Sequence, residues 1–437
     1  MENNILDNLG ISELNDMQKK MSEAFLHSGS DIVLLSPTGT GKTLAYLLPL
    51  VASVDKANDN VQAVVVVPGR ELALQSVNVL RAMKCGVRGY ACYGGRQTMD
   101  EHREIRKLMP QIIFATPGRL NDHIDKDNIS IAHVRTVVID EFDKCLDMGF
   151  SGEMMSLMTK LRFASRHVLL SATAVDAIPQ YVNISNTRMI DYRTENNDLS
   201  DRIRIHVLRS VKKDKLDTLY ACLCSIGSDS AVVFVNYRDS VERVADYLCE
   251  KGFVVSAFHG GLDQKEREAA LYKFSNGSAN IMVCTDLASR GLDIDGIGHV
   301  IHYHLPETRE ACTHRNGRTA RWDATGDVIF LLGPSETLPD YVISDDEMTL
   351  PDILPQPSKP RMATIYIGKG KKDKISRGDI LGLICKKGGV DKDNVGKIDV
   401  KERYAYVAVS TDVVKQLLQK LRNEKIKGVK TVFELLR

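Results

Sequence analysis

Short runs of apolar residues recur along the first part of the chain, and each run ends in small or polar residues. Five of these runs are rich in Val and Ile and predict strands: Asp31–Ser36, Ala63–Val67, Gln111–Ala115, Arg135–Asp140 and His167–Ser171. Segments with the period of an amphipathic helix lie between them, for example Arg70–Met83 and Met99–Leu108. Strands that alternate with helices predict an α/β fold, in which helices cover both faces of a parallel sheet.

The same alternation begins again after a polar stretch, Tyr192–Ser200, which we interpret as an interdomain linker. Five further apolar runs predict the strands of a second α/β unit: Ala231–Val235, Val254–Phe258, Ile281–Cys284, His299–His302 and Asp327–Leu331. A second linker, Pro351–Pro360, carries four prolines in ten residues, which favours an extended spacer.

The residues after this spacer predict a small α+β domain, because short β runs alternate with helical segments: Ala363–Ile367, Arg377–Cys385, Tyr404–Val409, Thr411–Asn423 and Thr431–Leu435. The pattern therefore divides the chain into α/β domains at 1–198 and 199–350, a proline-rich linker at 351–360 and a C-terminal domain at 361–437.

Composition excludes several classes of protein. The 437 residues are 43% hydrophobic and 26% charged, which are ordinary globular values and exclude a wholly disordered or fibrous chain. No run approaches the roughly 18 apolar residues of a membrane-spanning helix. The nine cysteines are scattered and form neither a disulfide framework nor a CxxC metal site. We therefore expect a cytoplasmic protein that makes no membrane contact.

Charge is distributed unevenly along the chain. Residues Arg361–Arg437 hold 19 Lys and Arg against 9 Asp and Glu, a net charge of +10, whereas the remaining 39 and 48 give −9. The basic C-terminal domain could be a lysine-rich solubilising tail. The alternative, which we favour, is a module that binds a polyanion.

A phosphate-binding pattern follows the first predicted strand, where Asp31–Thr43 has the sequence DIVLLSPTGTGKT. Gly39 and Gly41 would let backbone N–H groups approach an anion, and Lys42 would contact the β and γ phosphates of a nucleotide. Thr43 would hold Mg²⁺, and the nucleotide-binding loop would also include Ser36, Thr38 and Thr40. A chance Gly-rich turn is the alternative.

A pair of carboxylates ends a later strand, in the sequence TVVIDEFD at Thr136–Asp143. Asp140 is placed to bind Mg²⁺ through water, and Glu141 to orient or deprotonate the attacking water. An acidic pair after a strand is often only a solvated loop. Together with the phosphate-binding loop, however, the pair predicts an NTPase site that uses ATP and Mg²⁺.

In this order, SPTGTGKT, DEFD and Ser171-Ala172-Thr173 resemble the motifs of the DEAD-box RNA helicases. PGREL at Pro68–Leu72, the Gly94–Gly95 pair and TPGRL at Thr116–Leu120 are similar to that family's RNA-contacting motifs. The resemblance implies two tandem RecA-like domains. It also implies an adenine contact from Gln18, coupling through Ser171 and Thr173, and an RNA-backbone grip by four residues: Arg70, Gly95, Thr116 and Arg119.

The second unit lacks a phosphate-binding loop but carries HRNGRTAR at His314–Arg321. Arg318 and Arg321 are three residues apart, so on a helical turn they would project to the same side. They could begin a solvated basic helix, or they could be arginine fingers delivered across a cleft. The family resemblance favours fingers that reach the γ-phosphate and implies further roles: ribose binding by Asp293, coupling by His314, and RNA contacts from Asn236, Gln264, Arg267 and Thr285.

The C-terminal domain carries three tyrosines in two β runs. Tyr404 and Tyr406 are two apart and share one face of a strand, and Tyr366 could lie beside them. They could pack into a core or stack RNA bases. Residues 361–437 resemble the RRM-like RNA-binding domain of the DbpA-type DEAD-box helicases, which docks on structured ribosomal RNA, and lysines that include Lys371 and Lys372 could form a patch off the sheet face.

We therefore predict an ATP-dependent RNA helicase that is a monomer and locally unwinds or remodels structured RNA, with ribosomal RNA during ribosome assembly as its target. An ATP-gated RNA clamp or annealer with little unwinding activity is one alternative. A DNA-directed translocase is another, and the RRM-like domain argues against it.

Overall fold

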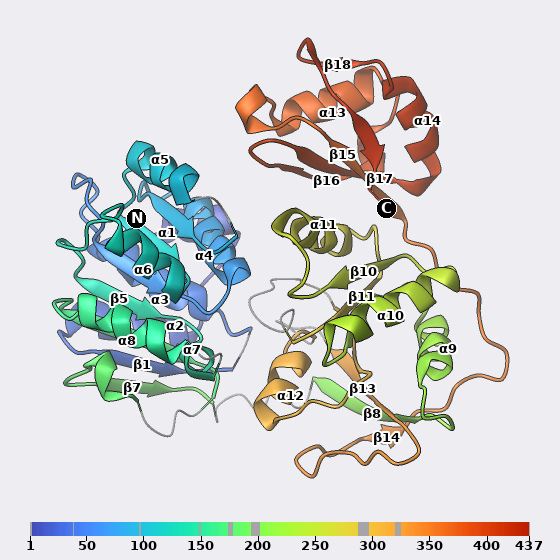
Figure 1. Cartoon of the computed structure of the whole chain (residues 1–437), viewed down its shortest axis with the longest axis horizontal. Helices are drawn as coiled ribbons and strands as arrows, with labels where there is room; N and C mark the ends of the chain where they lie inside the picture. The colour runs from blue at the N-terminus through green and yellow to red at the C-terminus, as the bar shows by residue number, and fades with distance from the viewer. Residues whose placement is uncertain are drawn as a thin grey trace. The chain divides into compact units, whose positions relative to one another are not determined.

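A computed structural model of the chain describes residues 2–37, 39–95, 98–147, 150–173, 178–193, 202–286, 297–319 and 325–436. The described residues up to 193 form one compact unit, and those from Arg202 onward form another, which holds both the second sheet and the C-terminal domain (Figure 1). Within the described residues, no helix is long and apolar enough to cross a membrane.

The first unit is built on a sheet of seven parallel strands in the order β3-β4-β2-β5-β6-β1-β7. Its strands are β1 Ile32–Leu35, β2 Ala63–Val66, β3 Gly89–Cys92, β4 Ile112–Ala115, β5 Thr136–Ile139, β6 Arg166–Ser171 and β7 Arg188–Asp191. Its helices are α1 Glu2–Leu9, α2 Asp16–His27, α3 Lys42–Ser53, α4 Arg70–Ala82, α5 Thr98–Leu108, α6 Pro117–Asp125, α7 Phe142–Asp147 and α8 Ser151–Lys160.

Alternate residues of each strand enter two separate cores, as a sheet covered on both faces requires. Ile32 and Leu34 of β1 pack with residues of α2, α3 and α4, whereas Val33 and Leu35 pack with residues of α6, α7 and α8. The five predicted strands and the parallel, two-sided sheet are confirmed.

Two strands of this sheet, β3 and β7, were not predicted. Both lie at sheet edges, and their sequences, GYAC and RMID, lack the run of β-branched residues that marks the central strands. They join the sheet because neighbouring strands offer unpaired backbone groups, which local sequence does not show.

The second sheet has the strand order β10-β11-β9-β12-β13-β8-β14. Its strands, all parallel, are β8 Ile203–Arg209, β9 Ala231–Phe234, β10 Val255–Phe258, β11 Ile281–Cys284, β12 His299–His302, β13 Gly326–Leu332 and β14 Asp346–Glu347. Its helices are α9 Leu216–Ile226, α10 Arg238–Glu250, α11 Gln264–Ser275 and α12 Arg309–Asn316. The five predicted strands are present, and β8 and β14 are additional.

The C-terminal domain is a four-stranded antiparallel sheet of order β16-β17-β15-β20 with helices on one face. Its elements are β15 Met362–Ile367, α13 Arg377–Lys386, β16 Val395–Val400, β17 Ala405–Ser410, α14 Thr411–Leu421 and β20 Phe433–Leu435, with a small hairpin of β18 Lys425–Ile426 and β19 Val429–Lys430. Ile365 and Val407 face α13 and α14, which leaves Tyr366 and Tyr406, directly paired across the strands, on the other face. The predicted α+β fold is confirmed.

Candidate functional site

The strand order of the first sheet gathers the predicted nucleotide-binding motifs. The phosphate-binding loop follows β1, Asp140 follows β5, and Ser171 ends β6. These three strands are neighbours, because β6 pairs with β1 on one side and with β5 on the other. Since parallel strands end at the same edge, motifs far apart in the sequence meet there.

The phosphate-binding loop depends on two glycines with left-handed backbone angles, Gly39 at φ +82° and Gly41 at φ +86°. A Cβ atom on Gly41 would lie 2.5 Å from Gln18 Nε2, so both the angle and the space require glycine. Gly41 precedes α3, and the N–H groups of a helix's first turn make no hydrogen bonds within the helix, so they can face an anion. Lys42 Nζ donates to the carbonyls of Ser36 at 2.6 Å and Pro37 at 2.8 Å, which places its charge beside the loop.

The Gln18 segment is joined to this loop. Asn15 caps α2 in a capping box, since Gln18 N donates to Asn15 Oδ1 at 2.9 Å and Asn15 N donates to Gln18 Oε1 at 3.0 Å. Asn15 Nδ2 also donates to Thr40 O at 3.0 Å, and Gln18 Nε2 to Gly41 O at 3.4 Å. This fixes Gln18 beside the phosphate loop, and its contact with adenine stays a prediction.

The two carboxylates lie where a divalent cation would be held. Asp140 is 2% exposed, and burial, reinforced by the neighbouring Glu141 charge, raises its pKa to about 7. Glu141 has a left-handed backbone at φ +51°, and its buried Oε2 has no hydrogen-bond partner within the described residues. A buried carboxylate next to a partly exposed one whose buried oxygen is unsatisfied within the described residues fits Mg²⁺.

The described residues contain no group of three or more His, Cys, Asp or Glu side chains that could hold a metal ion. Mg²⁺ is usually bound by one or two carboxylates together with water and substrate phosphates.

The predicted coupling residues join β6 to the acidic motif. Thr173 Oγ1 donates to Asp143 Oδ2 at 2.9 Å, and Ser171 Oγ donates to the Thr173 carbonyl at 2.7 Å. A shift of either segment would therefore be felt by the other. Coupling itself stays a prediction.

The predicted RNA contacts of the first unit follow β2, β3 and β4, the other half of the same sheet. Arg70 begins α4, and its NH1 would lie 2.8 Å from a Cβ atom on Gly95, which has φ +91°. Thr116 caps α6. The structure thus brings Arg70 and Gly95 into contact and separates this group from the nucleotide motifs by strand position.

Arg119 is held by a buried network. Its Nε donates to Tyr93 O at 3.2 Å, and it forms an ion pair with Glu101 at 3.4 Å. The same carboxylate lies 2.9 Å from His123 Nε2. Glu101 and His123 are almost fully buried, and the sequence analysis did not identify them.

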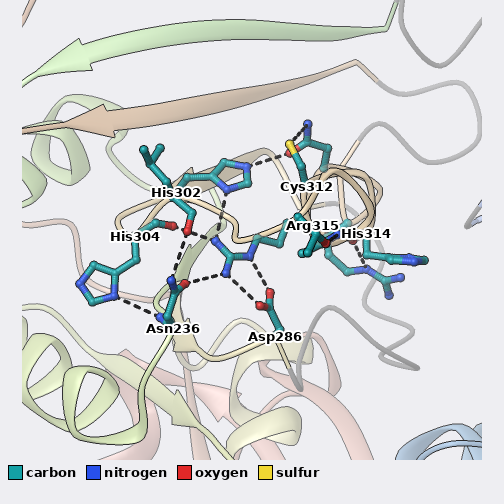
Figure 2. Close-up of polar contacts among 12 residues, drawn as sticks. Asn236, Asp286, His302, His304, Cys312, His314 and Arg315 are labelled. Carbon is teal, nitrogen blue, oxygen red and sulfur yellow. Dashed lines mark hydrogen bonds and ion pairs between the residues drawn. The ribbon is translucent and has the colours of Figure 1, made fainter. Parts of the chain in front are cut away.

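A second network, shown in Figure 2, surrounds Arg315 in the second unit. This side chain is 0% exposed and contacts Asp286 Oδ1 at 2.5 Å through Nε and Asp286 Oδ2 at 3.0 Å through NH2. NH2 also donates to Asn236 Oδ1 at 2.9 Å, and NH1 to His304 O at 2.8 Å. One guanidinium therefore joins the ends of β9, β11 and β12.

The other predicted RNA residues of the second unit follow the adjacent strands β9, β10 and β11. Thr285 follows β11 directly and lies one residue before Asp286. Arg267 on α11 is buried and donates to Gly260 O at 2.9 Å, while Gln264 Nε2 donates to Glu268 Oε1 at 3.2 Å. The strand order thus places Asn236, Gln264 and Thr285 at one edge of the sheet.

Arg318 follows the end of α12 at Asn316, and the next residue, Thr319, forms a parallel bridge with Ile297. That Arg318 and Arg321 project to the same side stays a prediction, because Arg321 lies outside the described residues. Arg318 is buried and donates through Nε to His314 O at 3.3 Å. Three predicted residues lie outside the described ranges, namely Thr38, Asp293 and Arg321. Residues 194–200 of the first linker lie outside them as well.

The three tyrosines of the C-terminal domain share one face, as predicted, with ring centroids 5.2–6.0 Å apart. Tyr406 is 0% exposed, however, and the others are half-buried, because α11 of the second unit covers this face. Lys371 and Lys372 are exposed. Base stacking by the tyrosines stays a prediction, which their covered position does not support.

Comparison with known proteins agrees with this arrangement. Residues 15–180 match the DEAD/DEAH box helicase family, 212–323 the helicase conserved C-terminal domain and 364–435 the DbpA RNA binding domain. The chain is 33% identical to the ATP-dependent RNA helicase DbpA of Escherichia coli, over 97% of this chain and 94% of that protein. The chain belongs to the DEAD-box family of ATP-dependent RNA helicases.

Other proteins are similar to about three quarters or more of this chain. CshA of Geobacillus kaustophilus is 34% identical over 76% of this chain and 71% of its own length. The structure of S. cerevisiae Dbp5 bound to RNA and ADP BeF3 is similar with a TM-score of 0.66 at 25% identity, covering 76% of this chain and 87% of that one. Mss116p bound to ssRNA and AMP-PNP gives 0.69 at 25%, covering 80% and 77%.

As a DEAD-box helicase the protein is an RNA-dependent ATPase, as the sequence predicted. Four residues of these networks were not predicted from the sequence: Glu101, His123 and Arg315, which are buried, and Asp286, which is partly exposed. A weak signal was available, because Glu101 occupies a core-facing position of an amphipathic helix and Arg315 lies inside the HRNGRTAR motif.

Proposed function

We propose that this DEAD-box helicase remodels structured ribosomal RNA during ribosome assembly, as a cytoplasmic monomer. The observation that supports the target is the C-terminal domain, which carries a net charge of +10 and matches the DbpA RNA binding domain. We place the domains at 1–198, 199–350 and 361–437, with 351–360 as the linker.

We propose that the first unit binds ATP at the carboxyl ends of β1, β5 and β6. The loop N–H groups around Gly39 and Gly41 hold the phosphates, and Lys42 neutralises their charge. Thr43 and Asp140 would hold Mg²⁺, which when bound would supply charge stabilisation at the β and γ phosphates. Glu141 orients or deprotonates the attacking water through a carboxylate whose Oε2 has no hydrogen-bond partner within the described residues.

RNA would bind along both sheets without base reading, because backbone contacts position a strand but carry no sequence information. Arg70, Gly95, Thr116 and Arg119 act in the first unit, and Asn236, Gln264, Arg267 and Thr285 in the second. In our proposal, ATP and RNA together favour a closed state, in which Arg318 and Arg321 reach the γ-phosphate. In that closed state Asp293 contacts the ribose, and His314 couples ATP binding to the domain interface. Differential affinity for this state drives the cycle.

Target selection would then come from the C-terminal domain, and exposed Lys371 and Lys372 are the charges that we assign to it. The test compares RNA-stimulated ATP hydrolysis on a ribosomal RNA fragment and on its scrambled sequence, at about 50 and 200 mM salt. Three chains are compared: the full chain, a chain ending at residue 360, and Lys371→Ala with Lys372→Ala.

The matched control, Lys386→Ala with Lys415→Ala, removes the same charge from exposed positions on the helical side of the domain. We expect the truncated chain to hydrolyse ATP at high RNA concentration but to lose its preference for the ribosomal fragment. The lysine pair should lose part of the preference and the control none. A truncated chain that discriminates as well as the full chain would contradict the assignment.

A further inference from the structure

One face of α11 carries an aromatic side chain among its charged ones, whereas a helix face exposed to solvent usually carries polar and charged residues. Lys265, Glu268 and Tyr272 lie three and four residues apart, so they line one side of the helix. Tyr272 is only 4% exposed. Something other than the sheet beneath α11 must therefore cover this side chain.

The covering surface is the sheet face of the C-terminal domain, which belongs to the same compact unit. The Tyr272 ring stacks on Tyr406 with centroids 5.1 Å apart and planes at 29°. The Tyr272 hydroxyl donates to the Lys397 carbonyl. Offset stacking of two buried rings adds to the free energy of burial itself.

Charged groups complete the contact around this stack. Tyr404 donates its hydroxyl to Glu268 Oε2 at 2.9 Å, and Lys401 Nζ lies 3.7 Å from the same oxygen. Lys265 Nζ lies 4.6 Å from the centre of the Tyr366 ring, a cation–π distance. Each of the three tyrosines on the sheet face therefore contacts a side chain of α11.

The far edge of the contact is polar and fully paired. Thr364 on β15 is 1% exposed, accepts from Asn276 Nδ2 at 3.0 Å and donates to Ser278 Oγ at 2.9 Å. Lys397 Nζ donates to Ser275 Oγ at 3.2 Å. The buried Thr364 hydroxyl is therefore paired on both sides by groups of the second unit, which favours a specific fit. The buried Tyr406 hydroxyl, in contrast, has no hydrogen-bond partner within the described residues, so the Tyr406 ring contributes by stacking alone.

We propose that the sheet face carrying Tyr366, Tyr404 and Tyr406 is a docking surface for α11 of the second unit rather than a platform for stacking RNA bases. The same Glu268 carboxylate accepts from Gln264 Nε2 through its other oxygen, at 3.2 Å. Docking therefore fixes the C-terminal domain against the helix turn that bears Gln264 and Arg267. RNA held by exposed lysines such as Lys371 reaches the core in a defined orientation, which a flexible spacer alone would not give.

Amide hydrogen exchange in the full chain tests the docking directly and needs no target RNA, so it is independent of the ribosomal assignment. Glu268→Lys places a cation opposite Lys401 and removes the acceptor of Tyr404. We expect exchange in α11 and in β16–β17 to accelerate by about fivefold or more, because local opening governs exchange. Adding Lys401→Glu swaps the charges and should return exchange most of the way to that of the wild type.

The matched control is Glu250→Lys, which makes the same charge change at the exposed end of the neighbouring helix α10. It should leave exchange in these segments unchanged. If Glu268→Lys exchanges like the wild type, the domains do not dock in solution and the proposal fails.

A binding measurement tests the rejected alternative. Loss of a ring that stacks on a base weakens binding by about 5- to 150-fold. With a hairpin RNA that has a mixed-sequence single-stranded extension, we expect Tyr404→Ala to change the affinity of the full chain by less than about threefold while raising exchange in α11. A loss of affinity above about tenfold would show that the tyrosines bind RNA, and would overturn the proposal.

Discussion

The two α/β units have the same strand order but different chemistry at corresponding strand ends. In the first, β1 leads into a Gly-rich loop and Lys42 opens α3; in the second, β8 leads to Lys215, which caps α9. Lys215 is buried, donates to the Leu331 carbonyl at 2.9 Å and forms an ion pair with Glu336 at 2.6 Å. The charge of Lys215, which lies near the corresponding position of the second unit, is thus neutralised by Glu336 of the same unit.

The second difference lies at β5 and its counterpart β12. Strand β5 continues into Asp140 and Glu141, whereas β12 continues into Tyr303 and His304. Burial lowers the pKa of His304. The shared topology brings several loops together at one edge of each sheet. We expect a few residues at that edge to determine whether phosphate and metal bind there. In the second unit the charged residues near the strand ends are instead the arginines Arg315 and Arg318.

The strongest test of this comparison exchanges the two lysines for alanine. Lys42→Ala should reduce ATP hydrolysis on the order of 10³-fold, the scale of a lost charge at the transition state. Lys215→Ala should lower the melting temperature but leave the rate per folded molecule within about threefold. The measurement is RNA-stimulated ATPase with melting curves alongside. A Lys42→Ala rate within tenfold of the wild type would remove the contrast.

Arg318→Ala tests what the second unit contributes to the first. Hydrolysis should fall by about 10³-fold or more, the effect of a lost arginine finger, without weaker ATP binding to the first unit. Steady-state ATPase and binding of a fluorescent ATP analogue measure the two effects. A loss confined to RNA affinity would instead assign Arg318 to the RNA contacts.

Arg315→Lys compares the buried networks of the two units. Lysine keeps the charge but cannot hold Asp286 and Asn236 with one planar fork, so we expect the RNA concentration for half-maximal ATPase to rise by about tenfold. Glu101→Gln should have the equivalent effect in the first unit, through Arg119. Unchanged RNA dependence in a variant that still melts cooperatively would mean that the networks only stabilise the fold.

The smallest effect concerns pH. Burial, followed by the charge of Arg315, lowers the pKa of His302 to about 3. Because the unfolded chain binds this proton near pH 6.5 and the folded chain does not, stability should fall as pH decreases from about 6.5 toward 3, by about 1.4 kcal/mol per pH unit. His302→Leu should flatten the slope by that amount in urea titrations. Equal slopes would mean that His302 is protonated in the fold.

The local features of this protein could be predicted from its amino-acid sequence. Central strands such as Ala63–Val66 and Ile281–Cys284 were readable because strands buried on both faces are runs of β-branched residues. The phosphate loop was readable for a similar reason, since glycines, lysine and helix start all lie within a few consecutive residues. Each of these signals is carried by neighbours in the chain.

Contacts between groups far apart in the sequence, in contrast, depend on how the elements pack in three dimensions. In the first sheet, strand order separates the predicted nucleotide motifs from the predicted RNA motifs, although the RNA motifs lie between the nucleotide motifs in the sequence. Arg315 and Asn236 are 79 positions apart, and Tyr404 and Glu268 are 136 apart. No local pattern encodes such a pair, because burial and hydrogen bonding depend on which surfaces pack together. The tyrosines show this most clearly, since their spacing predicted a shared face, and packing alone determined that the face meets α11.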